Sequence, residues 1–463
     1  MEHMEKSTSK FGSWIKNSAS VRMLVVGVLT LILLIPLSFI ESLINERQAN
    51  QENVVKEINE KWGAEVLLYG PILKVPYKTY TKVYKENAET KEKYIEKRYK
   101  INYLYLFPKQ LDTKANLAPE LRHRGIYNSV VYKGTMALKG KFVKPDFALL
   151  DIIEADVDWA KSKIIVQTSN LKGINNKVNI VMNNNTYSFL PKYSNTQTNN
   201  TYMYDENRNV DMHSLESTYI KKSDLPDSLD IDFSIDLSFN GSKQLRIIPI
   251  GEETTMNIKS DWKTPKFIGS YLPFNSDKVN DNGFDANWKV LNINRGFAQT
   301  FINELPDLQE FAFGVNLIIP IDQYQQSMRT AKYGYLVISL TFLVFFLFQS
   351  ISKVDIHPFQ YLMIGVALTL FYTLLLSISE HSNFFVAYLI AGISVILLIS
   401  LYSKSILKKR KFAMFIAASL TALYTFIYVI IQLENYALLA GSIGLFIILA
   451  AVMFASRKID WRN

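Results

Sequence analysis

Apolar and polar positions divide the chain into two kinds of segment. Long apolar runs occur at residues 22–40 and five more times after residue 332, whereas residues 41–332 contain no comparable run. Each run is long enough to cross the hydrocarbon core of a bilayer as a helix. The pattern predicts a multi-pass α-helical membrane protein with six spans and a large water-exposed region between spans one and two.

The ends of the apolar runs set the predicted boundaries. No small-x-small cleavage motif follows residues 22–40, so this run is interpreted as a retained signal anchor. The predicted segments are an N-terminal segment 1–21, the first span 22–40, a helical stalk 41–63, a β-rich domain 64–321, and a bundle 322–463 with a C-terminal tail and spans at about 333–349, 359–379, 384–402, 412–431 and 436–455.

Between residues 64 and 321 the hydrophobic period changes to two. In IDFSIDLSF (231–239) apolar and polar residues alternate, as in a strand with one buried face. About eleven segments of this kind, rich in β-branched and aromatic residues, are separated by turns that contain Gly, Pro and Asn. They predict an all-β domain of antiparallel, sandwich-like architecture. The Asn-rich residues 193–209 are expected to form a solvated loop.

The charge distribution predicts how the chain is oriented. Residues outside 41–332 carry 13 of the 51 Lys+Arg but only 6 of the 42 Asp+Glu. Four of these positive residues fall on residues 1–22 and nine on segments 350–357, 403–411 and 456–463, whereas the short segments 380–383 and 432–435 carry none. Because positive residues are retained on the cytoplasmic side, both termini are predicted to be cytoplasmic and residues 41–332 to be exported. This distribution is not that of a nucleic-acid-binding surface.

The sequence contains no recognisable catalytic or metal-binding motif. The chain has no cysteine, and its five histidines form no His-x-x-x-His or Glu-x-x-His motif. KGTMALKGKF (133–142) resembles a phosphate-binding loop, but Phe142 replaces the required Ser or Thr, and the segment has a strand pattern. The sequence therefore predicts no catalytic residue, no cofactor and no metal site.

One pair of ionisable residues has an unusual position. In LSISEHSNF (376–384), Glu380 and His381 lie between two apolar runs, where a charge needs water or a partner. One interpretation is a solvated loop. The other is a cluster with Asp322, Tyr324 or Arg329 of DQYQQSMRTAKYG (322–334), which would dock the β domain onto the bundle or sense pH.

Two further candidates complete the set of functional or docking residues. Lys332 lies in the same segment as Arg329, and His357 precedes Pro358 at the predicted start of the third span. Proline suits the first turn of a helix, so His357 is interpreted as a helix-start and interface residue.

The chain resembles the CreD family of inner-membrane cell envelope integrity proteins. The resemblance is carried by DQYQQSMRTAKYGYLVISLTFLVFFLFQ (322–349), IHPFQYLMIGVALTLFYTLLLSISEH (356–381) and RKIDW (457–461). It implies an inner-membrane protein linked to envelope integrity and to the β-lactam response, under two-component regulation. It implies no known reaction and no established catalytic residue.

Three classes of function follow as hypotheses. The favoured one is a non-enzymatic envelope protein whose β domain binds a periplasmic protein or a glycan while the helices hold it in the lipid bilayer. The second is an enzyme or transporter at the outer leaflet that uses Glu380 and His381 as acid and base. The third is a membrane sensor of envelope stress. The sequence gives no oligomeric state.

Overall fold

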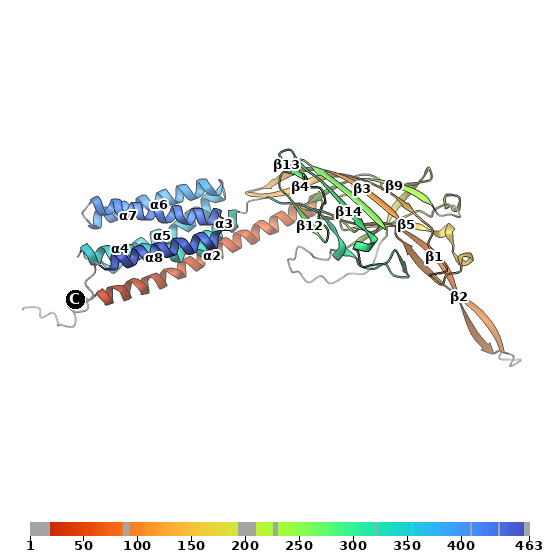
Figure 1. The fold of residues 1–463 in the computed structure, drawn as a ribbon, viewed down its shortest axis with the longest axis horizontal. Helices are drawn as coiled ribbons and strands as arrows, with labels where there is room; N and C mark the ends of the chain where they lie inside the picture. The colour runs from red at the N-terminus through yellow and green to blue at the C-terminus, as the bar shows by residue number, and fades with distance from the viewer. Residues whose placement is uncertain are drawn as a thin grey trace, which may run out of the picture. The chain divides into compact units, whose positions relative to one another are not determined.

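A computed structural model describes residues 19–86, 93–192, 210–225, 230–319, 323–352, 354, 356–407, 410–433 and 436–457. The chain divides into two compact units, which we call the helical unit (Met1–Asn53 and Ile321–Asn463) and the β unit (Val54–Pro320). Figure 1 shows helices in the first and a large curved sheet in the second. The predicted loop at 193–209 and candidate Asp322 lie outside the described residues.

In the helical unit, the described residues contain six helices that are long and apolar enough to cross a membrane, which confirms the predicted number. A short helix, α3, precedes the last five of them and was not predicted separately. The helices are α2 (Ala19–Trp62), α3 (Gln323–Lys332), α4 (Gly334–Ser352), α5 (Pro358–Ser379), α6 (Phe384–Leu407), α7 (Arg410–Gln432) and α8 (Ala437–Ser456).

Two glycines let α2 approach the other helices closely. A Cβ atom on Gly365 of α5 would lie 2.0 Å from Leu33 of α2, and one on Gly334 of α4 would lie 2.7 Å from Leu37. Leu33 and Leu37 are correspondingly buried. In a bilayer the hydrophobic effect does not drive helices together, so their association depends on close packing. Small residues at the contact allow the helix backbones to approach each other. The predicted first span therefore packs into the bundle.

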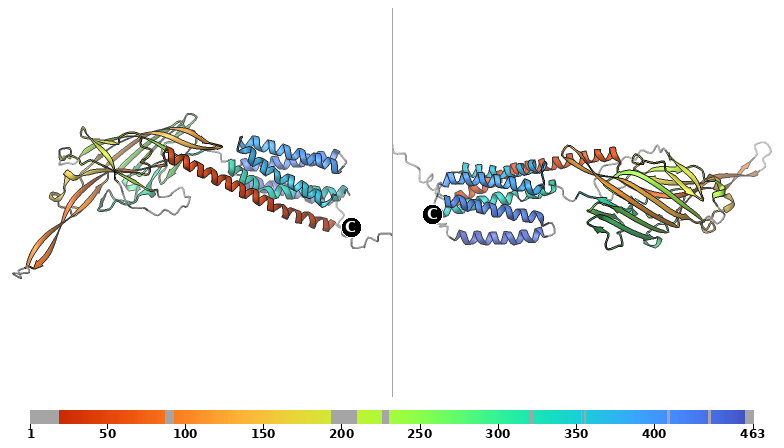
Figure 2. Two further views of the ribbon diagram at one scale, coloured as in Figure 1. Left: turned by 180° about the vertical axis from the view of Figure 1, so that it is seen from behind. Right: turned by 90° about the horizontal axis from the view of Figure 1, so that it is seen from above.

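In the β unit, the described residues form one sheet of sixteen strands (Figures 1 and 2). The strands are β1 (Val66–Glu86), β2 (Lys93–Leu106), β3 (Gln110–Arg124), β4 (Tyr127–Phe142), β5 (Lys163–Thr168), β6 (Asn179–Met182), β7 (Asn185–Lys192), β8 (His213–Ser217), β9 (Ile231–Ser242), β10 (Gln244–Ile247), β11 (Glu253–Ser260), β12 (Pro265–Gly269), β13 (Val279–Asn280), β14 (Gly283–Leu291), β15 (Thr300–Ile302) and β16 (Phe313–Leu317). The main path runs β12-β16-β10-β1-β5-β8-β7-β6-β9-β4-β3-β11-β14-β13.

The prediction of an antiparallel, sandwich-like domain is wrong. The sheet is mixed, because β1 pairs with β10 and β3 pairs with β11 in parallel. It also curls into a nearly closed barrel. Near the two ends of the path, Phe267 of β12 contacts Trp288 of β14 with ring centroids 5.8 Å apart, and Phe274 N donates to Asn287 O at 2.9 Å. Alternation along a strand shows which face is buried but not which strand lies beside it, so the period could not give this topology.

The KGTMALKGKF segment lies in β4 and forms a strand. Its two glycines make room for aromatic rings of the neighbouring strand β9. A Cβ atom on Gly134 would lie 2.6 Å from the Phe239 ring, and one on Gly140 would lie 2.5 Å from the Phe233 ring. Both phenylalanines are buried. The glycines therefore serve close packing in the core.

Candidate functional site

Glu380 lies at a junction of three helices in the helical unit. It follows the last residue of α5, and its side chain is 13% exposed. The Tyr324 hydroxyl of α3 donates to Glu380 Oε1 at 3.3 Å, and Arg47 Nε of α2 lies 3.7 Å from the same oxygen. Segment 322–334 therefore does meet Glu380, through Tyr324, and the adjacent cation comes from the first long helix. The sequence analysis did not consider Arg47.

The structure describes four of the other sequence candidates, and each lies on or beside α3 or α5. His381 is exposed in the turn after α5, and Arg329 and Lys332 are exposed on α3. His357 caps the N-terminus of α5: its Nδ1 accepts from Phe359 N at 3.2 Å, and its backbone N donates to the side chain of Gln360 at 3.0 Å. The 22 residues of α5 place His357 about 33 Å from Glu380. His357 is therefore not part of the junction at Glu380.

A polar cavity of about 390 Å³ in the β unit has the features of a binding site. It lies where the long strands β1 and β2 leave the rest of the sheet. Five lysines, two carboxylates and four tyrosines line it, with one proline and one isoleucine. The lining residues are Lys74, Pro76, Tyr77, Lys78, Tyr99, Ile101, Tyr103, Asp158, Lys161, Lys163, Lys192, Glu216 and Tyr219.

Three lysines of this cavity converge on one carboxylate. Lys163 Nζ donates to Glu216 Oε2 at 3.1 Å. Lys192 Nζ lies 3.1 Å and Lys74 Nζ 3.7 Å from Glu216 Oε1. Strand pairing forces this arrangement, because Lys74 of β1 stands opposite Lys163 of β5, and β8, which carries Glu216, pairs with β5 and β7. One negative charge therefore faces three positive ones.

The pKa values of the cluster follow from burial and charge. Burial would raise the pKa of Glu216, but Lys163, Lys192 and Lys74 outweigh it, so this pKa lies below its ordinary value. Burial lowers the pKa of Lys74, and the charges of Lys192 and Lys163 add to this effect against the attraction of Glu216. Glu216 is therefore held as an anion, and Lys74 loses its proton more easily than an ordinary lysine.

The tyrosines of the cavity orient its lysines. Lys74 Nζ lies 4.3 Å from the centroid of the Tyr103 ring, and Lys163 Nζ lies 4.7 Å from that of Tyr219. Lys78 Nζ lies 5.3 Å from the Tyr99 ring. Such contacts stabilise an ammonium group without neutralising its charge. These ring contacts hold three ammonium groups at the wall of the cavity.

The sequence analysis missed this site. Lys74 and Lys163 lie at strand positions that read like any solvent-facing lysine, and Glu216 lies in β8, a strand that was not predicted. Their meeting depends on pairs of strands that are far apart in the chain. No local motif signals it.

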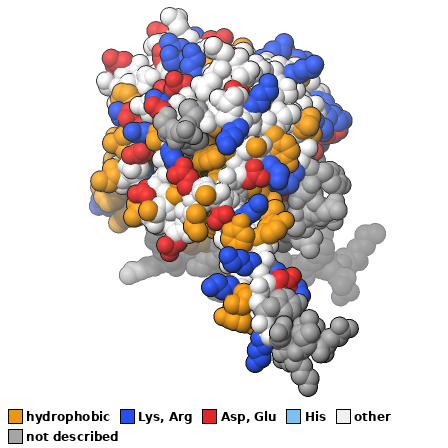
Figure 3. Space-filling model, turned by 90° about the vertical axis from the view of Figure 1, so that its right-hand side faces the viewer, with side chains coloured by type: hydrophobic (Ala, Val, Ile, Leu, Met, Phe, Trp, Pro, Cys, Tyr) orange, Lys and Arg blue, Asp and Glu red, His pale blue; other side chains and the backbone are white. Residues whose placement is uncertain are grey.

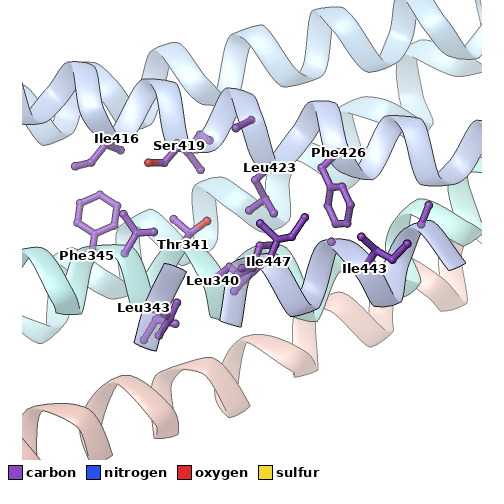
Figure 4. Close-up of a pocket in the computed structure, with 17 residues that line it drawn as sticks. Leu340, Thr341, Leu343, Phe345, Ile416, Ser419, Leu423, Phe426, Ile443 and Ile447 are labelled. Atoms are coloured by element: carbon purple, nitrogen blue, oxygen red, sulfur yellow. The ribbon is translucent and has the colours of Figure 1, made fainter. Parts of the chain in front are cut away.

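A second cavity, of about 590 Å³, lies in the helical unit between α4, α7 and α8 (Figure 4). Its walls are almost entirely apolar, with Phe345, Leu423, Phe426 and Ile447 among the side chains drawn. Thr341 and Ser419 contribute its hydroxyl groups. A crevice of this composition in a membrane protein suits acyl chains and offers little polar specificity.

The described residues thus define a multi-pass membrane protein with a large mixed-sheet domain that carries a cationic cavity. The chain belongs to the CreD family: the family model described as "Inner membrane protein CreD" matches residues 18–462. "Inner membrane protein CreD" of Escherichia coli (strain K12) is 29% identical over 439 residues, which cover 93% of this chain and 91% of that protein. The resemblance is confirmed, and the chain is a multi-pass protein of the inner membrane.

Proposed function

We propose that this CreD-family protein supports cell envelope integrity by binding an anionic glycan of the periplasm, and that it catalyses no reaction. The site is the cavity of the β unit. The observation that carries the proposal is the surplus of positive charge around Glu216, where three lysines face one carboxylate. An anionic group of a ligand would supply the missing negative charge.

The chemistry of the lining supports a sugar that carries carboxylates or phosphates. Five lysines against two carboxylates favour an anion. The tyrosines combine an apolar ring face with a polar hydroxyl, which suits the mixed surface of a sugar ring. A neutral ligand would leave the lysines uncompensated, so charge complementarity favours the acidic class.

The proposed topology places the cavity in the periplasm. The positive residues of segments 403–411 and 456–463 favour the cytoplasm, and segment 380–383 carries no Lys or Arg. Both termini are then cytoplasmic and residues 41–332 periplasmic. Within the helical unit, Glu380, Tyr324 and Arg47 act in this proposal as a structural junction.

Complementation of a deletion strain tests the proposal. The strain should become sensitive to detergent and β-lactam, and the wild-type gene should restore resistance. The double variant Lys74→Gln/Lys163→Gln should fail to restore it despite normal membrane levels. The matched control is Lys259→Gln/Lys289→Gln, whose lysines are exposed and lie opposite Asp285 and Glu253 at 2.8 and 2.7 Å. Full rescue by the cavity variant would overturn the proposal.

A further inference from the structure

Beyond the cavity, β1 and β2 continue as a two-stranded arm. The pairing of β1 with β5 ends at Lys74, and that of β2 with β15 ends at Leu104. The two strands remain paired with each other as far as Glu86 and Lys93. In Figures 1 and 2 they project from the sheet as a long hairpin. The arm offers two faces that the sheet does not cover.

One face of the arm carries aromatic and basic residues in register. Directly opposite residues of an antiparallel pair point to the same side. We call this face the arm platform, and its cross-strand pairs are Pro76 with Tyr103, Lys78 with Ile101, Tyr80 with Tyr99, Lys82 with Lys97, and Tyr84 with Ile95. The opposite face carries, among others, the pairs Thr79 with Lys100, Thr81 with Arg98, and Val83 with Glu96.

The platform is exposed although much of it is apolar. Tyr80 is 52%, Tyr99 61% and Tyr84 75% exposed. Figure 3 shows hydrophobic, basic and acidic side chains together on the arm. An exposed patch that combines aromatic and basic groups in a row is typical of an interaction surface.

The Lys82 and Lys97 pair indicates the charge of the partner. These two lysines stand directly opposite each other, which is unfavourable for like charges. Tyr80 and Tyr99 flank them on one side, and Tyr84 on the other. An anion between the two ammonium groups would relieve their repulsion, with flat ring faces on either side.

The platform is continuous with the cavity. Lys78, Tyr99, Ile101 and Tyr103 belong to both. From Pro76 to Tyr84 the platform extends about 27 Å at the usual rise of a strand. The combined surface therefore suits a long ligand whose negative charges repeat along its length.

We propose that the ligand is a linear acidic polysaccharide that starts in the cavity and continues along the arm platform. Tyr80, Tyr84 and Tyr99 contact the sugar rings, Lys78 binds one carboxylate or phosphate group, and Lys82 and Lys97 together bind another further along the arm. This inference rests on the function proposed above and adds the length and repeating charge of the ligand. Three exposed tyrosines on the face of the arm favour sugars over an acidic peptide, which would pair along a strand edge.

Oligogalacturonates of one to eight residues test the inference, because each sugar carries one carboxylate. Calorimetry on the full-length protein in detergent should show that affinity rises with chain length, so that hexagalacturonate binds at least tenfold more tightly than the monomer, the single sugar galacturonate. Lys82→Gln/Lys97→Gln should flatten this rise and leave the affinity for the monomer unchanged. Arg98→Gln/Lys100→Gln removes the same charge from the opposite face and should keep the rise.

The outcomes separate the two proposals. Binding of the monomer with no gain from chain length would overturn the arm inference and leave the cavity proposal standing. Absence of binding at every length would overturn both. If oligoglutamate peptides or vesicles of phosphatidylglycerol bind as tightly as oligogalacturonates of the same charge, the ligand is not specifically a polysaccharide and the inference is wrong. Neutral cello-oligosaccharides should bind more weakly at every length.

Discussion

Glu380 of the helical unit and Glu216 of the β unit are buried to the same degree but differ in their surroundings. Their side chains are 13% and 14% exposed. Glu380 contacts one arginine and one tyrosine hydroxyl, whereas Glu216 faces three lysines. The first arrangement balances its charge internally. The second leaves positive charge available to a ligand.

This difference changes how ionisable residues are ranked as functional candidates. Glu380 attracts attention because of its place between two apolar runs, yet its contacts join α2, α3 and α5. Glu216 has no unusual place in the sequence, yet its strand brings three cations together. Uncompensated charge in a cavity is therefore the stronger indication of binding in this protein.

The largest expected effect is loss of ligand affinity on removal of one cavity lysine. Lys163→Gln removes the hydrogen bond to Glu216 and one charge from the cavity. A hydrogen bond between this ammonium group and an anionic group of the ligand would contribute about 1.5–3 kcal/mol, so the affinity for hexagalacturonate should fall roughly 10- to 150-fold. Calorimetry of the full-length protein measures this change. If the Lys163→Gln protein binds hexagalacturonate as tightly as the Lys259→Gln protein does, Lys163 does not contribute to a binding site.

Glu216→Gln should act in opposite directions on binding and stability. Loss of the carboxylate frees three lysines, so the affinity for hexagalacturonate should rise several-fold, and their mutual repulsion should lower the melting temperature. Because the pKa of Glu216 is lowered in the folded protein, its stabilisation is complete above the ordinary value of 4.5 and is lost as pH falls below it. Thermal melts from pH 7 to pH 3 should therefore show a smaller acid loss in the variant.

A basic pH limit is expected for binding. The ammonium of Lys74 has a lowered pKa, so it loses its charge at a lower pH than an ordinary lysine. Affinity for hexagalacturonate should therefore decline as pH rises toward the ordinary value of 10.5, before the exposed lysines titrate. Lys74→Arg should keep binding to higher pH. A decline identical in both proteins would show that Lys74 does not control it.

The junction at Glu380 should affect stability and leave binding unchanged. Tyr324→Phe and Glu380→Gln should each destabilise the full-length protein by about 1 kcal/mol. A double-mutant cycle should show coupling of about 0.5 kcal/mol or more, because the two side chains share one hydrogen bond. Denaturation followed by fluorescence in detergent measures both values. Weakened hexagalacturonate binding in either variant would show that the junction at Glu380 contributes to ligand binding.

The smallest effect is expected at His381. Its side chain is exposed, so His381→Ala should change stability by less than about 0.5 kcal/mol. The variant should also complement a deletion strain. Failure to complement, despite normal membrane levels, would support the hypothesis that His381 acts in acid and base catalysis at the outer leaflet.

The sequence alone identified the six apolar helices, the β-rich region between the first two, and the family. These properties depend on the length and period of local segments and on motifs read along the chain. A contact between Glu380 and Tyr324 was one of two interpretations of the sequence, beside a solvated loop, and the structure shows this hydrogen bond at 3.3 Å. His357 was placed at the start of a helix through the adjoining proline.

The tertiary structure alone decided the order of the strands and the place of the cavity. Lys74, Lys163, Lys192 and Glu216 come from four strands, and only their pairing converts ordinary polar positions into a cluster. Strand alternation specifies a buried face but leaves the neighbouring strand open. The number of spans could therefore be predicted from local composition, whereas the proposed binding site depends on contacts between residues as far apart as Lys74 and Glu216.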